Sequence, residues 1–380
     1  IVRVGGGPLD DSSGIESEAD TSSLPRTNET AHIIFTSGSS GGPPKAVLCG
    51  HSGSLLSHAS RVPAEAGTRF GCCVFGIWDA AAAHLSGGTA VMLPDAALRD
   101  ADLLAALLAT NDIERMLITP TLLDTALSSA AARASLSLLR SITLCGELPT
   151  SSLVERARTI LPDTVELINL YSSCEAHDVA VGDLRAEPNP FALSPLPHVE
   201  TFIVDQSGEP VAEGIFGSLL VGGAALADGY LHDPANKAAD SRFVPMEDHV
   251  PSAPVARPGQ LVCRTGDRAL VLRRDGIHVT RFELAGREDA IVKVRGVAVP
   301  LAEVELAFLR RFGAVAKACA AVALPCADSD ELGLACVFDD GCDSELKSPS
   351  GIRAALGEVL AANAVPLHVV CVDRLPVDRL

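Results

Sequence analysis

Apolar residues fall into two kinds of pattern along the first half of the chain. Short apolar runs, which have the length of buried strands, occur at 32–35, 115–119, 141–145 and 164–170. Apolar residues at helical spacing occur at 101–110 and 151–161. Because strands and helices alternate here, we expect a parallel α/β sheet.

The pattern changes in the second half of the chain. Strand-like runs separated by Gly and Pro turns predict an antiparallel or small barrel-like β section, at 200–205, 217–222, 260–263 and 269–273. Beyond Arg287, a separate α+β unit is predicted by strand-like runs at 291–294, 317–323, 332–338 and 368–372 and by helical spacing at 301–312 and 351–362.

These changes divide the chain into three parts. Residues 1–30 are rich in Gly, Ser and acidic residues and are predicted to be a linker or frayed entry. Residues 31–288 are predicted to form a large α/β subdomain, and residues 289–380 a small α+β subdomain. The chain begins at Ile1 and ends at Leu380, and we expect it to be part of a larger protein.

Composition narrows the class of protein. A hydrophobic fraction of 47% supplies a buried core and excludes a disordered chain. With 30 basic and 48 acidic residues the formal charge is −18, so we expect neither a nucleic acid nor an anionic membrane as partner. No apolar run approaches the roughly 18 residues that span a bilayer. The tightest run, 71–78, is predicted to be a buried strand.

The chain has 11 scattered cysteines and no C-x-x-C pair. This pattern resembles neither a disulfide framework nor a zinc site. It predicts a reducing, cytoplasmic compartment in which most cysteines act as small core residues.

The segment that follows the first strand combines hydroxyls, glycines and a lysine. It reads Thr36-Ser37-Gly38-Ser39-Ser40-Gly41-Gly42-Pro43-Pro44-Lys45. Glycines let backbone N–H groups approach an anion, hydroxyls add donors and a lysine adds charge, so the segment predicts a phosphate site. It is not a Walker A loop, and a flexible Gly/Ser loop is the alternative.

A second segment places polar groups at the end of a buried strand, where ligands bind in parallel sheets. It reads Asn169-Leu170-Tyr171-Ser172-Ser173-Cys174-Glu175. A tyrosine there can stack on a base, and a glutamate can bind Mg²⁺, which prefers oxygen ligands. The alternative is a strand end with a surface carboxylate.

Two further segments carry charges beside glycines. In Arg264-Thr265-Gly266-Asp267, an aspartate after a tight Gly turn can accept hydrogen bonds from two ribose hydroxyls; an ordinary Gly-Asp turn is the alternative. The stretch 286–296 places five charges and two glycines at the proposed subdomain boundary.

Taken in order, these segments resemble the adenylate-forming superfamily, and specifically the adenylation domains of nonribosomal peptide synthetases and related carboxylate reductases. Further matches are Trp78-Asp79, Cys145-Gly146-Glu147 and Gly229-Tyr230. The resemblance runs from about Ala31 to near the C-terminus, so most of the family's portion before the phosphate loop is missing from this sequence.

The resemblance implies that a small carboxylic or amino acid reacts with ATP and Mg²⁺ to give acyl-AMP and pyrophosphate. The acyl group then passes to phosphopantetheine on a partner carrier-protein domain. By the same resemblance Tyr171 would stack on adenine, Asp267 would hold the ribose and Asp289 would be the hinge. The implied catalytic residues are Lys45, Glu175 and Arg287. Thr36, Ser37, Gly38, Ser39, Ser40, Gly41 and Cys174 would contact phosphates, and Glu175 would bind the metal.

Three departures from the family pattern leave alternatives open. Pro43-Pro44 lengthens the phosphate loop by one residue, Cys174 stands where the family has threonine, and no lysine follows Lys347. The family carries a catalytic lysine near its C-terminus, so a non-catalytic or truncated remnant is one alternative. An acyl-CoA ligase, which shares these motifs, is the other.

The resemblance also implies a substrate pocket, lined by Val74, Phe75, Trp78, Cys145 and Leu170 and mostly apolar. Val74 stands where amino-acid-activating members have an aspartate, which predicts an acid without a free α-amino group or one held differently. Asp178 is a candidate carboxylate for a cationic substrate. Alternatively, Asp178 and His177 shape the exit of the chain from the strand.

Overall fold

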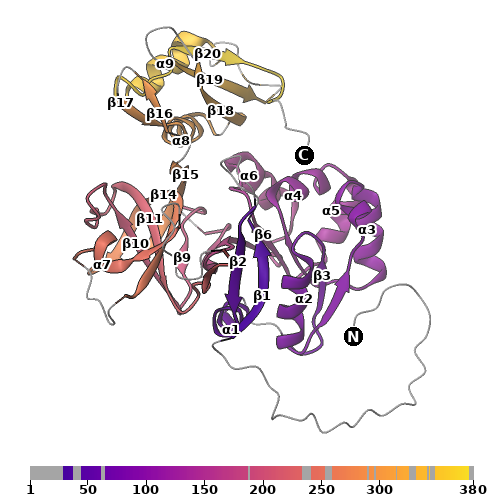
Figure 1. Cartoon of the computed structure of the whole chain (residues 1–380). Helices are drawn as coiled ribbons and strands as arrows, with labels where there is room; N and C mark the ends of the chain where they lie inside the picture. Colours follow the sequence, from indigo (N-terminus) through magenta and orange to yellow (C-terminus); the bar gives the residue numbers. More distant parts are fainter. Residues whose placement is uncertain are drawn as a thin grey trace, which may run out of the picture.

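The structure is a computed structural model that describes residues 29–36, 44–60, 65–186, 189–232, 241–252, 259–288, 291–294, 297–313, 315–324, 331–339, 342 and 347–375. Most of the predicted phosphate loop (37–43) and the predicted hinge Asp289 lie outside these residues. Figure 1 shows three groups of elements: an α/β group rich in helices, a group of strands beside it, and a small C-terminal unit.

A seven-stranded sheet forms the centre of the first group, in the order β4-β3-β5-β6-β7-β8-β9. Its strands are β3 (Arg69–Cys72), β4 (Thr89–Met92), β5 (Arg115–Ile118), β6 (Ser141–Cys145), β7 (Glu166–Ser173), β8 (His177–Asp183) and β9 (Ser194–Pro195). The five strands from β4 to β7 are parallel, which confirms the predicted α/β class. β8 pairs antiparallel with β7, and β9 pairs antiparallel with β8. Cys145, the last residue of β6, pairs with Leu170, and β7 continues beyond this pair to Ser173.

Helices accompany these strands: α1 (His51–Ser60), α2 (Gly76–Leu85), η2 (Asp95–Leu98), α3 (Ala101–Thr110), α4 (Pro120–Ala126), α5 (Ala130–Leu136) and α6 (Ser151–Ile160). Hydroxyl side chains cap three of them, because Thr119, Ser129 and Thr150 each accept a backbone N–H of the first turn. The largest core joins α3–α6 to the sheet through residues such as Leu104 and Ile142.

The predicted strand at 71–78 is correct only at its start. β3 ends at Cys72 and α2 begins at Gly76. An apolar run of eight residues does not distinguish a strand from a helix. Ile77 is 86% exposed, so the apolar character of this run does not reflect uniform burial.

The other strands before the C-terminal unit form two antiparallel sheets. The smaller contains β1 (Thr30–Phe35), β2 (Ala46–Gly50) and β12 (Gly229–Tyr230). The larger contains β10 (Val199–Val204), β11 (Phe216–Gly223), β13 (Phe243–Pro245), β14 (Leu261–Asp275) and β15 (His278–Arg287), with the short helix α7 (Met246–His249) after β13. The antiparallel character predicted for this section is confirmed.

The strands predicted at 260–263 and 269–273 are one strand, β14, and the turn predicted between them is wrong. Ser218 faces Arg268 and Leu220 faces Arg264, so Thr265, Gly266 and Asp267 lie opposite the single residue Leu219. The extra residues make a bulge, which Gly266 permits with a φ of +74°.

The C-terminal unit has its own core, built around Phe308, Phe312 and Phe338. Its elements are β16 (Ile291–Val294), β17 (Val297–Pro300), α8 (Leu301–Phe312), β18 (Ala316–Leu324), β19 (Glu331–Phe338), α9 (Pro349–Gly357) and β20 (His368–Cys371). α9 ends before the predicted residue 362, at a glycine of low helix propensity. Two of the unit's contacts with the rest of the chain are the hydrogen bond from Ser152 Oγ to Lys317 O at 2.9 Å and the ion pair between Arg310 and Glu283 at 3.1 Å.

None of the helices that the structure describes has the length and apolar character needed to cross a bilayer. Ten cysteines are described; all are free thiols, and five of them are buried. Within the described residues, the scattered cysteines therefore form no disulfide framework.

Candidate functional site

A pocket of about 310 Å³ lies where β7, β14 and β15 meet. Four predicted site residues line it: Leu170, Tyr171, Asp267 and Arg287. They come from two sheets, and their convergence results from the fold.

Tyr171, Asp267 and Arg287 form a hydrogen-bonded group in this pocket. The Tyr171 phenol donates to Asp267 Oδ2 at 2.5 Å, and Arg287 Nη1 donates to Asp267 Oδ1 at 3.1 Å. Burial raises the pKa of Asp267, although both bonds act to lower it. Burial and the neighbouring Asp267 carboxylate raise the pKa of Tyr171 well above its ordinary value.

The β14 bulge positions Asp267. Thr265 Oγ1 donates to Leu219 O at 2.8 Å and accepts the Asp267 N–H at 3.0 Å, so a side chain takes the place of a ladder hydrogen bond. Asp267 pairs with Arg287 across β14 and β15, which brings carboxylate and guanidinium to the same end of the sheet.

Glu175 lies in the turn between β7 and β8 and is only 4% exposed. Its Oε1 accepts the Tyr230 hydroxyl at 2.8 Å and lies 3.8 Å from Arg242 Nη1. Lys45 Nζ lies 5.1 Å from the centre of the Tyr230 ring, within the range of a cation–π contact. Burial, and then the charge of Glu175, raise the pKa of Tyr230. Lys45 and Glu175 thus both contact Tyr230, the lysine at its ring and the glutamate at its hydroxyl.

Arg242, which the sequence analysis did not select, joins these two groups. Its Nη1 donates to Thr265 O at 3.0 Å, and Arg287 Nη1 donates to the same oxygen at 3.3 Å. Arg242 immediately precedes β13 and belongs to no motif that the sequence analysis identified. Only the pairing of β13 with β14 brings it to the site.

The donor set around Glu175 fits a hard cation. Among the residues that the structure describes, no hydrogen bond is made to Glu175 Oε2. A carboxylate oxygen that the described protein groups do not occupy, beside a predicted phosphate site, is the kind of ligand that Mg²⁺ uses in combination with phosphate oxygens.

The two ends of the predicted phosphate loop are held together. The Lys45 N–H donates to Thr36 Oγ1 at 3.1 Å, and the Thr36 N–H donates to Lys45 O at 2.9 Å.

Cys174, the other predicted phosphate contact that the structure describes, carries a protonated thiol. Burial raises the pKa of this thiol to about 11, so Cys174 is a neutral and weak donor at pH 7.

The six residues of the predicted substrate pocket lie in several different environments. Phe75, Cys145 and Leu170 share one apolar cluster, whereas Val74 is 37% exposed. Trp78 lies elsewhere, stacked on His177 with ring centres 5.4 Å apart. Asp178 follows His177 in sequence and is 1% exposed, and its N–H donates to Ser57 on α1.

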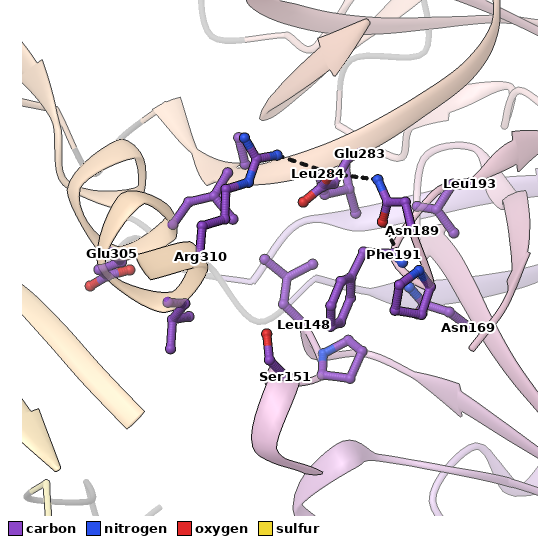
Figure 2. Close-up of a pocket in the computed structure, with 16 residues that line it drawn as sticks. Leu148, Ser151, Asn169, Asn189, Phe191, Leu193, Glu283, Leu284, Glu305 and Arg310 are labelled. Atoms are coloured by element: carbon purple, nitrogen blue, oxygen red, sulfur yellow. Dashed lines mark hydrogen bonds and ion pairs between the residues drawn. The ribbon is translucent and has the colours of Figure 1, made fainter. Parts of the chain in front are cut away.

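A second and larger cavity of about 460 Å³ lies between α8 and the large subdomain. In Figure 2, Arg310 of α8 reaches Glu283, which also accepts from Asn189. Four residues line both this cavity and the 310 Å³ pocket: Leu148, Asn169, Leu284 and Gly286. The two cavities are therefore adjoining spaces.

Comparison with known proteins shows which family and which relatives this chain resembles. Residues 4–231 match the model of the AMP-binding enzyme family. The chain is 34% identical over 376 residues to glycine betaine reductase ATRR of Emericella nidulans, covering 94% of this chain but 28% of that protein. It is 29% identical over 383 residues to tyrocidine synthase 3 of Brevibacillus parabrevis, covering 97% of this chain and 6% of the relative.

Solved structures share the fold. The amide bond synthetase McbA of Marinactinospora thermotolerans superposes with a TM-score of 0.69 at 24% identity, over 91% of this chain and 66% of that one. ATP-bound MatB of Rhodopseudomonas palustris superposes with a TM-score of 0.71 at 18% identity, over 93% and 66%. The resemblance drawn from the sequence motifs is confirmed: the chain belongs to the AMP-binding enzyme family of adenylate-forming enzymes.

Proposed function

We propose that this chain is an adenylation domain that activates a carboxylic acid with ATP and passes the acyl group to a carrier-bound phosphopantetheine thiol. The observation that carries the proposal is the gathering of Tyr171, Asp267 and Arg287 around a 310 Å³ pocket. Arg242 links this group to the buried Glu175.

In the first half-reaction, a carboxylate oxygen of the acid attacks the α-phosphorus of ATP. The bond to the β-phosphate oxygen breaks, and pyrophosphate leaves with the electron pair. Asp267 orients the ribose, the Tyr171 ring lies against the adenine, and Lys45 and Arg287 offset phosphate charge. Mg²⁺ held by Glu175 would neutralise charge on the phosphates. The rate gain comes from positioning and electrostatics.

In the second half-reaction, the thiol sulfur attacks the acyl carbon and AMP leaves, with the thiol proton passing to solvent. The 460 Å³ cavity supports this step because it adjoins the nucleotide pocket and opens beside α8. We propose it as the route by which the phosphopantetheine arm reaches the acyl group.

For the substrate, we propose an acid that carries no free primary amine. Val74 offers no carboxylate to an α-ammonium group at the position where the family pattern has an aspartate. A relative at 34% identity is named for glycine betaine, an acid whose nitrogen is fully methylated. Asp79, 3% exposed, follows Trp78 in sequence, and Asp178, 1% exposed, follows His177, whose ring stacks on that of Trp78; the negative charge of these two side chains would offset a positive charge near Trp78.

Two measurements test the proposal. Calorimetry of Mg·ATP binding compares the chain with Asp267→Ala, which should abolish binding. Pyrophosphate exchange then compares glycine, N,N-dimethylglycine, glycine betaine and 3,3-dimethylbutanoate, which has the shape of glycine betaine but no positive charge. Exchange with the methylated acids but not with glycine is the expected result.

The other outcomes separate the remaining candidates. Folded protein without Mg·ATP binding contradicts the proposal and leaves a non-catalytic scaffold, which the weak donor at Cys174 favours. Exchange followed by acyl transfer to free coenzyme A but not to a carrier domain would make the chain an acyl-CoA ligase.

A further inference from the structure

His32, Cys49 and His177 form a cluster that the proposed reaction does not use. One side-chain ligand atom from each residue lies within 4.8 Å of those from the other two. His32 and Cys49 pair across the neighbouring strands β1 and β2, whereas His177 begins β8, which is far away in sequence and belongs to another sheet. Cys49 is fully buried and His177 is 5% exposed.

His177 is oriented as metal-binding histidines are. Its Nδ1 lies 2.6 Å from Ala225 O and therefore carries the proton, so the lone pair is on Nε2. Ser54 Oγ lies 3.4 Å from Nε2 but donates its single proton to Gly50 O at 2.9 Å. The Nε2 lone pair is thus left to accept another partner.

The backbone and packing of His177 hold the ring in this position. Its φ is +54°, in the left-handed region that residues other than glycine seldom adopt and that concentrates at functional sites. Trp78 stacks on one side of the ring, and the His32 ring approaches edge-on with centres 6.0 Å apart. Strain at a rotationally fixed imidazole is expected where the imidazole has a task.

We propose that His32, Cys49 and His177 bind a zinc ion. One thiolate and two imidazoles are a ligand set that Zn²⁺ prefers, at about 2.3 Å for sulfur and about 2.0 Å for nitrogen. These lengths require ligand atoms roughly 3.3–3.7 Å apart, so the ligand atoms, which lie within 4.8 Å of one another, would approach by no more than about 1.5 Å on binding. Zinc displaces the Cys49 thiol proton to solvent as the sulfur–zinc bond forms, and a water molecule completes the tetrahedron.

The ion would join the strands on both sides of the phosphate loop to the Glu175 turn. β1, which precedes the loop, buries none of its six residues, so little apolar packing anchors it. Zinc on His32 would supply that anchor, and zinc on Cys49 and His177 would tie β2 to the start of β8. The proposed role is therefore structural, and the inference stands apart from the proposed adenylation chemistry.

The first test is metal content and spectroscopy of the untagged chain. We expect about one zinc per chain by elemental analysis, and replacement by Co²⁺ should give thiolate-to-cobalt charge transfer together with the strong visible bands of a tetrahedral site. A wild-type chain that binds no metal, or whose cobalt spectrum lacks the thiolate band, overturns the proposal without any variant.

Variants then assign the ligands. Cys49→Ser and His177→Ala should each weaken cobalt binding by at least about 100-fold, and Cys49→Ser should remove the thiolate band. Cys72→Ser is the matched control for a buried cysteine, and His58→Ala the control for a histidine packed on Trp78, with ring centres 4.0 Å apart. Retained binding in both cluster variants, or equal loss in both controls, contradicts the assignment.

Discussion

Arg242 and Arg287 donate to the same backbone oxygen, that of Thr265, at 3.0 and 3.3 Å. Each also faces a carboxylate: Arg242 lies 3.8 Å from Glu175, and Arg287 lies 3.1 Å from Asp267. The Thr265 carbonyl oxygen therefore connects Glu175, the proposed metal ligand, to Asp267, the proposed ribose ligand, through the two arginines.

Replacing Arg242 should impair both sides of this link. Arg242→Ala removes the cation beside the buried Glu175 and one donor to Thr265 O, and we expect pyrophosphate exchange to fall roughly 10- to 100-fold. The KM for Mg·ATP should rise with it. Arg281→Ala, which removes an exposed arginine from β15, is the control. Equal activity of the two variants would mean that Arg242 has no part in the site.

The Tyr171 phenol should set the pH range of nucleotide binding. Asp267 must be ionised to accept ribose hydroxyls, and burial raises its pKa. AMP binding should therefore weaken as the pH falls through this raised pKa. The Tyr171 bond lowers that pKa, so Tyr171→Phe should move the loss of binding to higher pH. Calorimetric titration with AMP across acidic pH measures the shift.

The chain's other tyrosine supplies the control for that experiment. Tyr230→Phe also removes a buried phenol, but that phenol bonds to Glu175. The AMP curve of Tyr230→Phe should keep the wild-type midpoint. If Tyr171→Phe also keeps it, Asp267 is not the titrating group.

Restoring a hydroxyl at position 174 should raise activity. The Cys174 thiol is neutral and a weak donor, whereas threonine offers a full hydrogen bond to phosphate. A hydrogen bond of about 0.6–1.4 kcal/mol corresponds to a roughly 3- to 10-fold faster pyrophosphate exchange in Cys174→Thr. Cys319→Thr in the C-terminal unit is the control. A slower Cys174→Thr enzyme would argue against a phosphate contact at this position.

The ion pair between Arg310 and Glu283 should contribute modestly to docking of the C-terminal unit. The side chain of Arg310 is 51% exposed and that of Glu283 is 7% exposed. Because solvent screens the pair, we expect a coupling free energy of about 0.5–1 kcal/mol. A double-mutant cycle of Arg310→Ala and Glu283→Gln by urea unfolding measures it, with Arg311→Ala as the control. A coupling free energy of zero would mean that the contact does not stabilise docking.

Local pattern was enough for elements whose ends coincide with changes in polarity. β6 and α3 have the predicted bounds because each is a run of one periodicity that ends at a clear break in the pattern, at Gly146 after β6 and at Asn111 after α3. The prediction failed where the same sequence pattern is compatible with two different local structures. The run at 71–78 contains a strand end and a helix start, and Gly266 signals a turn and a bulge equally well.

The site was predictable to the extent that its residues lie in contiguous motifs. Tyr171, Asp267 and Arg287 each lie in one, and the structure brings them together. Arg242 lies in none of them and reaches the site by strand pairing alone. The His32, Cys49 and His177 cluster was invisible to a search for short spacings, because each ligand comes from a different strand.

The strands that pair with β14 differ on the two sides of its bulge. Before the bulge, β14 lies between β11 and β13; after it, β14 lies between β11 and β15. Both edges of the strand are covered on either side of Asp267, so amide hydrogens there exchange with solvent only when several strands separate together. Nucleotide bound at Asp267 should therefore slow amide hydrogen exchange across the whole five-stranded sheet. Binding in one pocket would then lower the rate at which the five strands open together.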